Sequence, residues 1–138
     1  MKAILLSLRL LIAPLVLGLA LTFAHAAETA APKAKHVDAA GAAKLLETNK
    51  EVVVLDVRTE DEFKDGHIAK AVNIDFLDES FAEKISKLDK SKTYLVHCAA
   101  GGRSTKSLSK FSAKGFTNIY HLDGGLSAWE AAGKPVTK

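Results

Sequence analysis

The chain has 138 residues, 48% of them hydrophobic, and a formal net charge of +3 at pH 7. Lys2 and Arg9 lie within the first 26 positions, and the other 112 residues carry 17 basic side chains against 16 acidic ones. This balance forms no basic stripe that could neutralise a row of phosphates, so we expect no nucleic-acid partner. A length near 110 residues suits one domain with an ordinary core and leaves no room for a second.

The first 26 residues have the pattern of a secretory signal peptide. A positive start is followed by fifteen residues without a charge and by the small-residue cleavage pattern AHA at 24–26. The uncharged run is shorter than the about 20 residues of a membrane-spanning helix, and Pro14 and Gly18 interrupt it, so we prefer cleavage to an anchor. We expect a periplasmic protein, free of the membrane after cleavage, with a linker at residues 27–35.

From residue 36 to 138 the sequence alternates between strand-like and helix-like segments. Strands are expected at Val37, 52–57, 71–74, 93–98 and 117–122, and helices at 39–47, 59–66, 81–88, 103–114 and 126–133. Local signals support the helices: Asp38 can N-cap the first one, where Leu45 and Leu46 should face inward, and Thr59 and Glu62 form a capping box. The alternation predicts an α/β fold, an open parallel sheet flanked by helices on both faces. Ligands of such folds bind beyond the carboxyl ends of the strands.

Cys98 is the only cysteine, and it stands at such a strand end in the stretch YLVHCAAGGRS. An exported chain usually pairs its cysteines, so a lone one is either a buried inert thiol or a reactive one. Here a glycine-containing loop leads into a helix, and Gly101 and Gly102 let several backbone amides converge on one point. The helix dipole favours an anion there, so we expect Cys98 to have a lowered pKa and to be a nucleophile.

The neighbouring polar residues have more than one interpretation. Arg103 could close the pocket around an oxyanion or lie outward as a surface cation, and we favour the pocket. Ser104 could cap the helix or donate a hydrogen bond to the ligand. His97 should point to the opposite face of its strand from Cys98, which argues against a general base. The other histidines of the predicted domain lack ligand spacing, so we expect no metal site and no cofactor: His36, His67 and His121.

Three segments together resemble the signature blocks of the rhodanese family. They are VLDVRTEDEFKDGHIAKAVNI, VHCAAGGRS and IYHLDGGLSAWEAAGKPV, and the likeness covers roughly residues 36–136. With the signal peptide, the chain is similar to the single-domain periplasmic rhodaneses of the phage-shock protein E type. The resemblance implies a rhodanese-like sheet and a sulfurtransferase. Its thiolate takes a sulfane sulfur from a donor such as thiosulfate, holds it as a persulfide and passes it to cyanide or another thiophile, without a cofactor.

The resemblance also assigns roles to individual residues. Cys98 matches the family's nucleophile, and Arg103 matches a position often credited with anion binding. The residues between them match the loop whose amides cradle the persulfide: Ala99, Ala100, Gly101 and Gly102. Four more match positions that mainly brace the loop and a neighbouring turn: Asp56, Arg58, Glu62 and His67. Trp129 is interpreted as a core residue on a helix face.

Two other functions compete with sulfur transfer. A phosphatase or arsenate reductase uses a similar cysteine loop, but the resembling families place five residues between cysteine and arginine, whereas this chain has four. A shorter loop makes a tighter cradle, better matched to one sulfur atom than to a phosphoryl group. A non-catalytic binding module of the same fold often lacks the cysteine, which is present here. Nothing in the sequence indicates an obligate partner, so we expect a monomer that meets a small-molecule donor and acceptor.

Overall fold

The computed structural model describes residues 33–138, so the expected signal peptide and most of the expected linker lie outside the described residues. Five parallel strands form one sheet in the order β1-β5-β4-β2-β3. They are β1 (Lys35–Val37), β2 (Val53–Asp56), β3 (Val72–Asn73), β4 (Tyr94–His97) and β5 (Ile119–Leu122). The strand that leads to Cys98, β4, is therefore the central one. The first strand begins one residue before the expected start of the domain.

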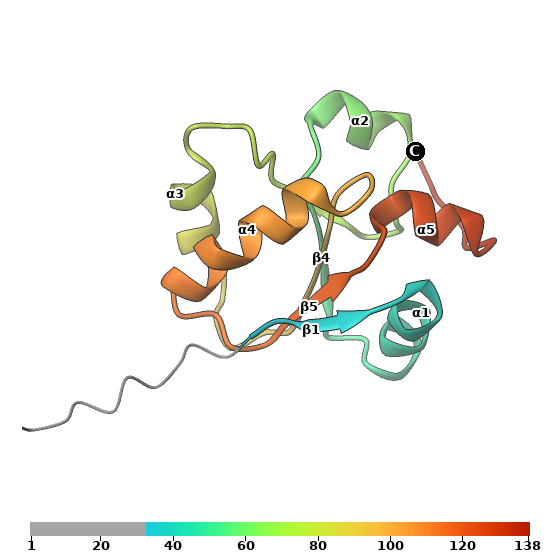
Figure 1. The fold of residues 1–138 in the computed structure, drawn as a ribbon, viewed down its shortest axis with the longest axis horizontal. Coiled ribbons are helices and arrows are strands. Elements are labelled where there is room, and N and C mark those ends of the chain that lie inside the picture. Colours follow the sequence, from blue (N-terminus) through green and yellow to red (C-terminus); the bar gives the residue numbers. More distant parts are fainter. Residues whose placement is uncertain (1–32) are drawn as a thin grey trace, which may run out of the picture.

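Five helices connect and cover the strands. They are α1 (Ala39–Thr48), α2 (Glu60–Asp65), α3 (Phe81–Ser86), α4 (Gly102–Ala113) and α5 (Gly125–Ala131). Figure 1 shows α3 and α4 on one side of the sheet and α1 and α5 on the other, with α2 beyond one end of the strands. The predicted open parallel sheet with helices on both faces is confirmed. Within residues 33–138 no helix is both long and apolar enough to cross a bilayer.

Each face of the sheet packs into its own hydrophobic cluster because successive strand side chains point to opposite faces. On β4, Leu95 packs with α1 and α5, whereas Val96 packs with α3 and α4. Four aromatic rings meet edge to face in the cluster with α3 and α4: Phe81, Phe111, Phe116 and Tyr94. The central strand is buried on both faces, which gives the residue after it a rigid support.

The helix boundaries follow the local signals. Asp38 caps α1 by accepting a hydrogen bond from the Gly41 amide, and Thr59 and Glu62 form the predicted capping box of α2. The buried residues of α1 are Ala39, Ala42 and Ala43, and the two predicted leucines are half-buried. Leu46 shares the face of these alanines and packs against their cluster, as predicted, whereas Leu45 is not part of that cluster.

The C-terminal segment returns to the region of α2. Thr137 and His67 exchange two backbone hydrogen bonds of 2.8 Å in an isolated antiparallel bridge. The Trp129 side chain is 5% exposed and its indole N–H donates to the carbonyl of Pro135 at 2.9 Å. This confirms the interpretation of Trp129 as a core residue and shows that it also fixes the chain end.

Candidate active site

Cys98 lies at the carboxyl end of β4, where the chain curls into the loop that precedes α4. It is 1% exposed, so the sulfur sits at the base of the loop and not on its rim. Two amides at the start of α5 hold the loop from the side: Leu126 donates to the Cys98 carbonyl at 2.8 Å and Ser127 to the Ala99 carbonyl at 2.9 Å. The loop is thus fastened to the sheet and to a second helix.

The Cys98 sulfur receives hydrogen bonds from two directions. The Gly101 amide donates at 3.1 Å, and the Ser104 hydroxyl lies 3.4 Å away. Gly101 has φ +108°, a backbone conformation that favours glycine and that turns its amide inward. Burial raises the pKa of the Cys98 thiol, but hydrogen bonds from Ser104 and from the loop amides outweigh it, so the pKa lies below its ordinary value. The loop therefore stabilises a negative charge on sulfur.

The remaining loop positions differ in exposure. Ala99 is half-buried and Ala100 and Gly102 are exposed, so part of the loop reaches solvent although Cys98 itself is buried. Gly102 is the first residue of α4 and Gly101 its N-cap, which aims the start of the helix at the loop. Of the four predicted loop residues, Gly101 donates its amide to the sulfur and the Ala100 amide also lowers the pKa of Cys98, which suits the binding of an anion.

Ser104 links the sulfur to a residue that the sequence analysis did not assign to the site. The buried Ser104 hydroxyl lies 2.8 Å from Nε2 of His121, and Nδ1 of His121 lies 2.8 Å from a carboxylate oxygen of Asp123. Strand alternation places His121 on the α4 face of β5, but the strand order that brings β5 beside β4 is not readable from one sequence. Ser104 therefore neither caps α4 nor stands alone beside the sulfur.

The pair Gly124-Gly125 permits a close approach of α5 to the loop. A Cβ atom on Gly125 would lie 2.4 Å from the Cys98 carbonyl oxygen and 2.7 Å from the Ala99 carbonyl oxygen, and its φ is +60°. Only glycine fits such a position, because any side chain would displace the cysteine loop. The Gly-Gly pair is thus part of the site, although the sequence analysis treated it only as a mark of resemblance.

Arg103 is held by α2, an arrangement that neither sequence interpretation foresaw. Its guanidinium donates to both carboxylate oxygens of Glu62 at 2.7 and 2.8 Å, and its side chain is 24% exposed. Glu62 also accepts from the Thr59 amide at 3.0 Å. The bound Arg103 guanidinium lowers the pKa of Glu62 to about 2. A guanidinium has five N–H donors, so donors remain for a ligand while Glu62 fixes the plane of the group.

Asp56 and Arg58 form a buried pair at the end of β2. The Arg58 guanidinium donates to Asp56 at 2.7 Å and to the Gly66 carbonyl at 2.7 Å, which ties the strand end to the turn after α2. His67 continues that turn, where it bonds to the Phe63 carbonyl at 2.9 Å and stacks on the Phe63 ring. None of these contacts reaches the sulfur, which agrees with a supporting role.

His97 is fully buried and faces away from the Cys98 sulfur. Its Nδ1 lies 3.0 Å from the Cys98 carbonyl oxygen, and its Nε2 lies 3.7 Å from Asp56 without a hydrogen-bond partner. Burial lowers the pKa of His97 and outweighs the opposing influence of Asp56, so the ring is neutral near pH 7. The geometry gives His97 no position from which to act as a base on the thiol.

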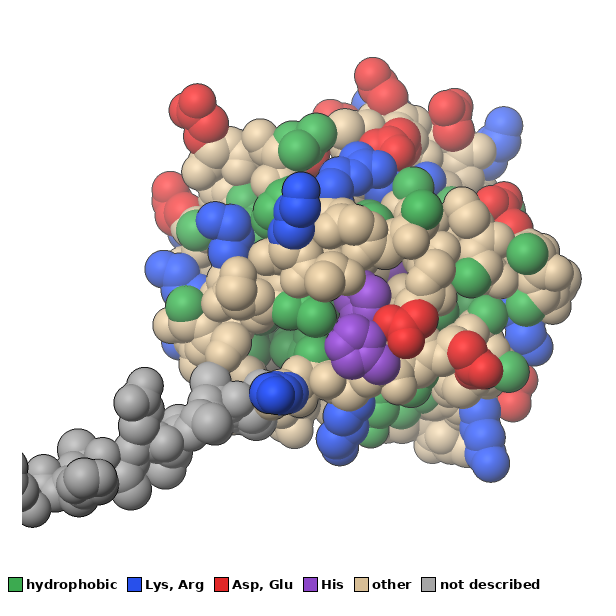
Figure 2. All heavy atoms as spheres, viewed as in Figure 1, with side chains coloured by type: hydrophobic (Ala, Val, Ile, Leu, Met, Phe, Trp, Pro, Cys, Tyr) green, Lys and Arg blue, Asp and Glu red, His purple; other side chains and the backbone are tan. Residues whose placement is uncertain are grey.

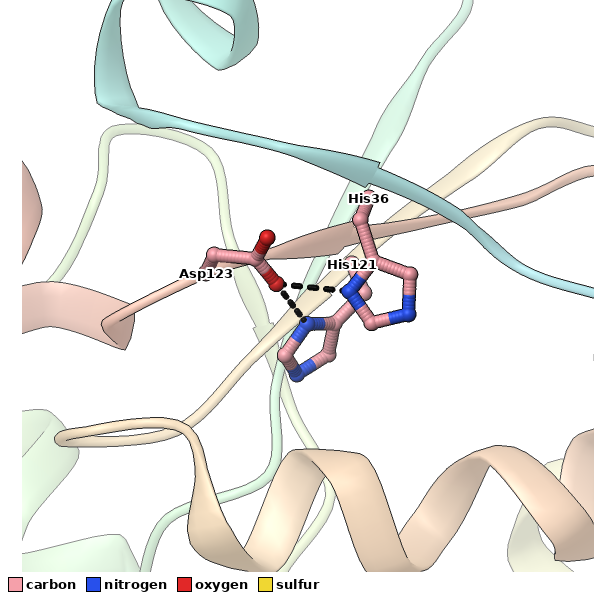
Figure 3. A group of neighbouring side chains, drawn as sticks. All are labelled: His36, His121 and Asp123. Atoms are coloured by element: carbon pink, nitrogen blue, oxygen red, sulfur yellow. Dashed lines mark hydrogen bonds and ion pairs between the residues drawn. The ribbon is translucent and has the colours of Figure 1, made fainter.

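The expectation that the histidines are scattered is wrong for two of them. His36 on β1 and His121 on β5 are paired in register, and each places Nδ1 beside the same oxygen of Asp123 (Figure 3). His67 lies elsewhere, beside α2. Among residues 33–138, His36, His121 and Asp123 are the side chains grouped closely enough to hold a metal ion.

Two surface hollows lie away from Cys98. One, of about 420 Å³, lies between α1 and the C-terminal segment and includes Trp129 and Ile68 in its wall. The other, of about 490 Å³, lies between α2 and the segment after β3 and includes Phe63 and Asp75. Cys98 lines neither hollow, so the chemistry of the site depends on the loop itself.

The central parallel strand ends in a buried cysteine. Backbone amides of a glycine-containing loop and the start of a helix lie around its sulfur. These features define an α/β protein with an anion-binding loop centred on a cysteine. The chain belongs to the family of the Rhodanese-like domain, which matches residues 38–132. Family membership and the relatives assign sulfurtransferase activity at the level of the family.

Two individual relatives carry names of this family, and a third similar structure carries a different description. Thiosulfate sulfurtransferase GlpE of Shewanella oneidensis is 35% identical over 83 residues, covering 60% of this chain and 80% of that protein. The crystal structure of a rhodanese-related protein from Thermoplasma volcanium superposes with a TM-score of 0.65 at 36% identity, covering 75% of this chain and 97% of the other. A Rhodopseudomonas palustris protein described as a possible tyrosine phosphatase superposes with a TM-score of 0.62 at 26% identity, covering 75% and 85%.

Proposed function

We propose that the protein moves a sulfane sulfur from thiosulfate to a thiophilic acceptor such as cyanide, with Cys98 as the carrier. The observation that carries the proposal is the sulfur environment: a Gly101 amide at 3.1 Å and a Ser104 hydroxyl at 3.4 Å stabilise a thiolate in a buried loop. A thiolate is the nucleophilic form of cysteine, and the same donors suit the terminal sulfur of a persulfide.

The reaction divides into two displacements. In the first, the Cys98 thiolate attacks the outer sulfur of thiosulfate, a new S–S bond forms, and the old S–S bond breaks as sulfite leaves with its electron pair. In the second, cyanide attacks the outer sulfur of the persulfide, thiocyanate leaves, and Cys98 returns to the thiolate. No proton or electron is needed from elsewhere, which is consistent with a sulfur that has no histidine of residues 33–138 at hydrogen-bond distance.

Arg103 is proposed to attract the anionic donor. Its bidentate pair with Glu62 orients the guanidinium and leaves three of its five N–H donors for an oxyanion. The sulfonate end of thiosulfate offers the oxygens that such a fork recognises. Asp56, Arg58 and His67 support the turn after α2, the helix that carries Glu62.

Phosphate or arsenate chemistry is the competing assignment for a cysteine loop. Cys98 and Arg103 are separated by four residues, one fewer than in the phosphatase loops that this segment resembles. The shorter loop therefore suits a single sulfur atom better than the three equatorial oxygens of a phosphoryl group. A non-catalytic module is the other alternative, and the lowered pKa of Cys98 argues against it.

The assignment is tested by steady-state kinetics with thiosulfate and cyanide. The wild type should form thiocyanate with a parallel-line pattern of double-displacement kinetics, and Cys98→Ser should form none. An aryl phosphate substrate is the matched control and should not be hydrolysed by either protein. Hydrolysis of that phosphate with no thiocyanate would replace the proposal with the phosphatase assignment.

We also propose that the protein acts in the periplasm after removal of residues 1–26. The support is the charge pattern and the 24–26 cleavage pattern of the sequence. Expression of the full chain in a Gram-negative host should yield protein in the periplasmic fraction with Ala27 as its first residue. Recovery of the intact N-terminus in the cytoplasm would contradict the localisation.

A further inference from the structure

His36, His121 and Asp123 form a cluster at the edge of the sheet, on the face that carries α4. One ligand atom from each of the three residues lies within 4.8 Å of the other two. His36 and Asp123 are each 53% exposed, while the His121 side chain is 3% exposed. Figure 2 shows histidine side chains beside an acidic one at the surface of this face. The cluster therefore combines a fixed inner ligand with two that solvent can reach.

Strand pairing brings the three residues together. His36 and His121 are in-register partners on neighbouring parallel strands, and their ring centroids lie 5.0 Å apart. Asp123 follows His121 by two positions, and one of its carboxylate oxygens lies beside Nδ1 of both rings (Figure 3). Two imidazoles and one carboxylate on adjacent backbone segments are a chelating set for zinc and similar divalent ions.

Nε2 of His121 has a hydrogen-bond partner, as the second ring nitrogen of a metal-bound histidine requires. A ligating imidazole donates its other ring N–H to a nearby acceptor, which fixes the tautomer. Nδ1 of His121 faces the cluster, and Nε2 lies 2.8 Å from the buried Ser104 hydroxyl oxygen, which can accept that N–H. His121 is thus already oriented with Nδ1 toward the cluster and with Nε2 beside a buried hydroxyl that can either donate or accept a hydrogen bond.

The local charge also favours a cation. Asp123 supplies the carboxylate of the cluster, and one of its oxygens lies 2.7 Å from Nδ1 of His36 and 2.8 Å from Nδ1 of His121. Lys35 precedes His36 but lies over the Tyr120 ring at 5.2 Å, on the opposite face of the strands. The Asp123 carboxylate adds one negatively charged ligand to the two imidazoles, as catalytic zinc sites with two histidines and a carboxylate do.

The spacing requires only a small adjustment. Both imidazole Nδ1 atoms lie 2.7–2.8 Å from the same Asp123 oxygen, as hydrogen-bond partners do. Ligands of one tetrahedral zinc ion stand roughly 3.3 Å apart, given metal–ligand bonds of about 2.0–2.1 Å. The exposed side chains of His36 and Asp123 can move outward by that difference without disturbing the core.

We propose that His36, His121 and Asp123 bind one divalent transition-metal ion, with zinc as the best-matched member of the class, and that water completes its coordination. The proposal does not rest on the proposed sulfur transfer: none of the three residues contacts the Cys98 sulfur, and His121 is linked to it only through Ser104. The cluster is a three-ligand open site at the sheet edge, separated from the sulfur by Ser104.

Isothermal titration of Zn²⁺ into the purified protein, carrying no histidine tag, tests the site. We expect one equivalent to bind to the wild type and to raise its unfolding temperature, since an ion that binds only the folded state stabilises it. His36→Asn and Asp123→Asn change exposed side chains, so both variants should fold, and each should weaken Zn²⁺ binding at least about tenfold.

Two control variants separate this site from other ligands. Asp61→Asn removes an exposed carboxylate from α2 and should bind Zn²⁺ like the wild type. Cys98→Ser should also retain the full equivalent, because the thiol is not part of the cluster. Absence of binding in the wild type, binding unchanged in both His36→Asn and Asp123→Asn, or loss of binding in Cys98→Ser would each overturn the proposal.

Discussion

Ser104 has one hydroxyl proton and three acceptors within reach. They are the Cys98 sulfur at 3.4 Å, the Gly101 carbonyl at 3.2 Å and Nε2 of His121 at 2.8 Å. When His121 carries its proton on Nε2, that nitrogen donates to Ser104 and the hydroxyl proton is free to turn toward sulfur. The serine is therefore the side chain through which the rest of the protein can influence the thiolate.

Ser104→Ala should raise the pKa of Cys98, because it removes a donor that stabilises the thiolate. A hydrogen bond to a charged group is worth about 1.5–3 kcal/mol, and this one is long, so its effect should lie at or below the lower end of that range. The measurement is the rate of Cys98 alkylation by iodoacetamide as a function of pH, and the rate at pH 7 should fall by up to about tenfold. Ser109→Ala, an exposed change on the same helix, is the control. An unshifted midpoint in Ser104→Ala would show that the amides alone set the pKa.

The pair of Glu62 and Arg103 predicts a pH dependence of stability. Glu62 has a pKa of about 2 in the folded protein against an ordinary value of 4.5. A carboxyl with a depressed pKa stabilises the fold above its unfolded pKa and loses that contribution as the pH falls through the folded value. The wild type should therefore lose more stability than Glu62→Gln as the pH falls from 4.5 to 2.

The expected difference is small because the Glu62 side chain is 36% exposed. Solvent screening limits such a pair to about 1 kcal/mol. Urea unfolding at several pH values measures it, with Glu130→Gln, an exposed glutamate of α5, as the control for the loss of one negative charge. Parallel pH curves for the wild type and Glu62→Gln would contradict the stabilising role of the pair.

At the scale of elements, the approach of α5 to the cysteine loop depends on one glycine. A Cβ on Gly125 would meet two loop carbonyl oxygens at 2.4 and 2.7 Å, whereas one on Gly133, which has φ +71°, would meet nothing within 4 Å. Gly133→Ala should therefore show the backbone cost alone, about 1–2 kcal/mol. Gly125→Ala should lose a further 1–3 kcal/mol or more through overpacking, together with most of the sulfur-transfer activity.

Urea unfolding of the two alanine variants gives this comparison directly. Because both glycines have positive φ, the difference between the variants isolates the steric contact with the loop. Equal losses of stability, with activity retained in Gly125→Ala, would mean that the loop and α5 can separate without consequence.

The elements that the sequence predicts well are those specified by neighbouring residues. The caps at Asp38 and Thr59 and the strand before Cys98 depend on short-range hydrogen bonds and on side-chain pattern, so one sequence is enough. The partner of Arg103 could not be predicted in this way. Glu62 lies 41 positions earlier and meets Arg103 only because β2 and β4 are adjacent in the sheet.

His121 and Asp123 were missed for the same reason. Strand order and register decide that β5 lies between β1 and β4, and these are properties of the whole sheet. The leucines of α1 were predicted in part: Leu46 shares the face of the buried alanines and packs against the core, whereas Leu45 is half-buried outside that cluster. Local pattern therefore predicted the cysteine loop and its helix, while the side chains that adjust the loop came from distant segments.

At the scale of the whole molecule, the sheet separates two packed layers, and the reactive cysteine lies at the carboxyl ends of its strands. The cluster with α3 and α4 holds Cys98 itself, and the other cluster holds Trp129 and the start of α5. The loop lies where the two layers meet, fixed by β4 below and by amides of α5 beside it. A rigid loop of this kind needs little rearrangement when charge moves between the thiolate and the persulfide.

The most direct measurement is the intact mass of the purified protein before and after thiosulfate, and again after cyanide. We predict a gain of one sulfur atom on the wild type that cyanide removes, and no gain on Cys98→Ser. The added sulfur should map to the peptide that contains Cys98. A wild-type mass unchanged by thiosulfate, with the thiol reduced and open to alkylation, would contradict the persulfide mechanism.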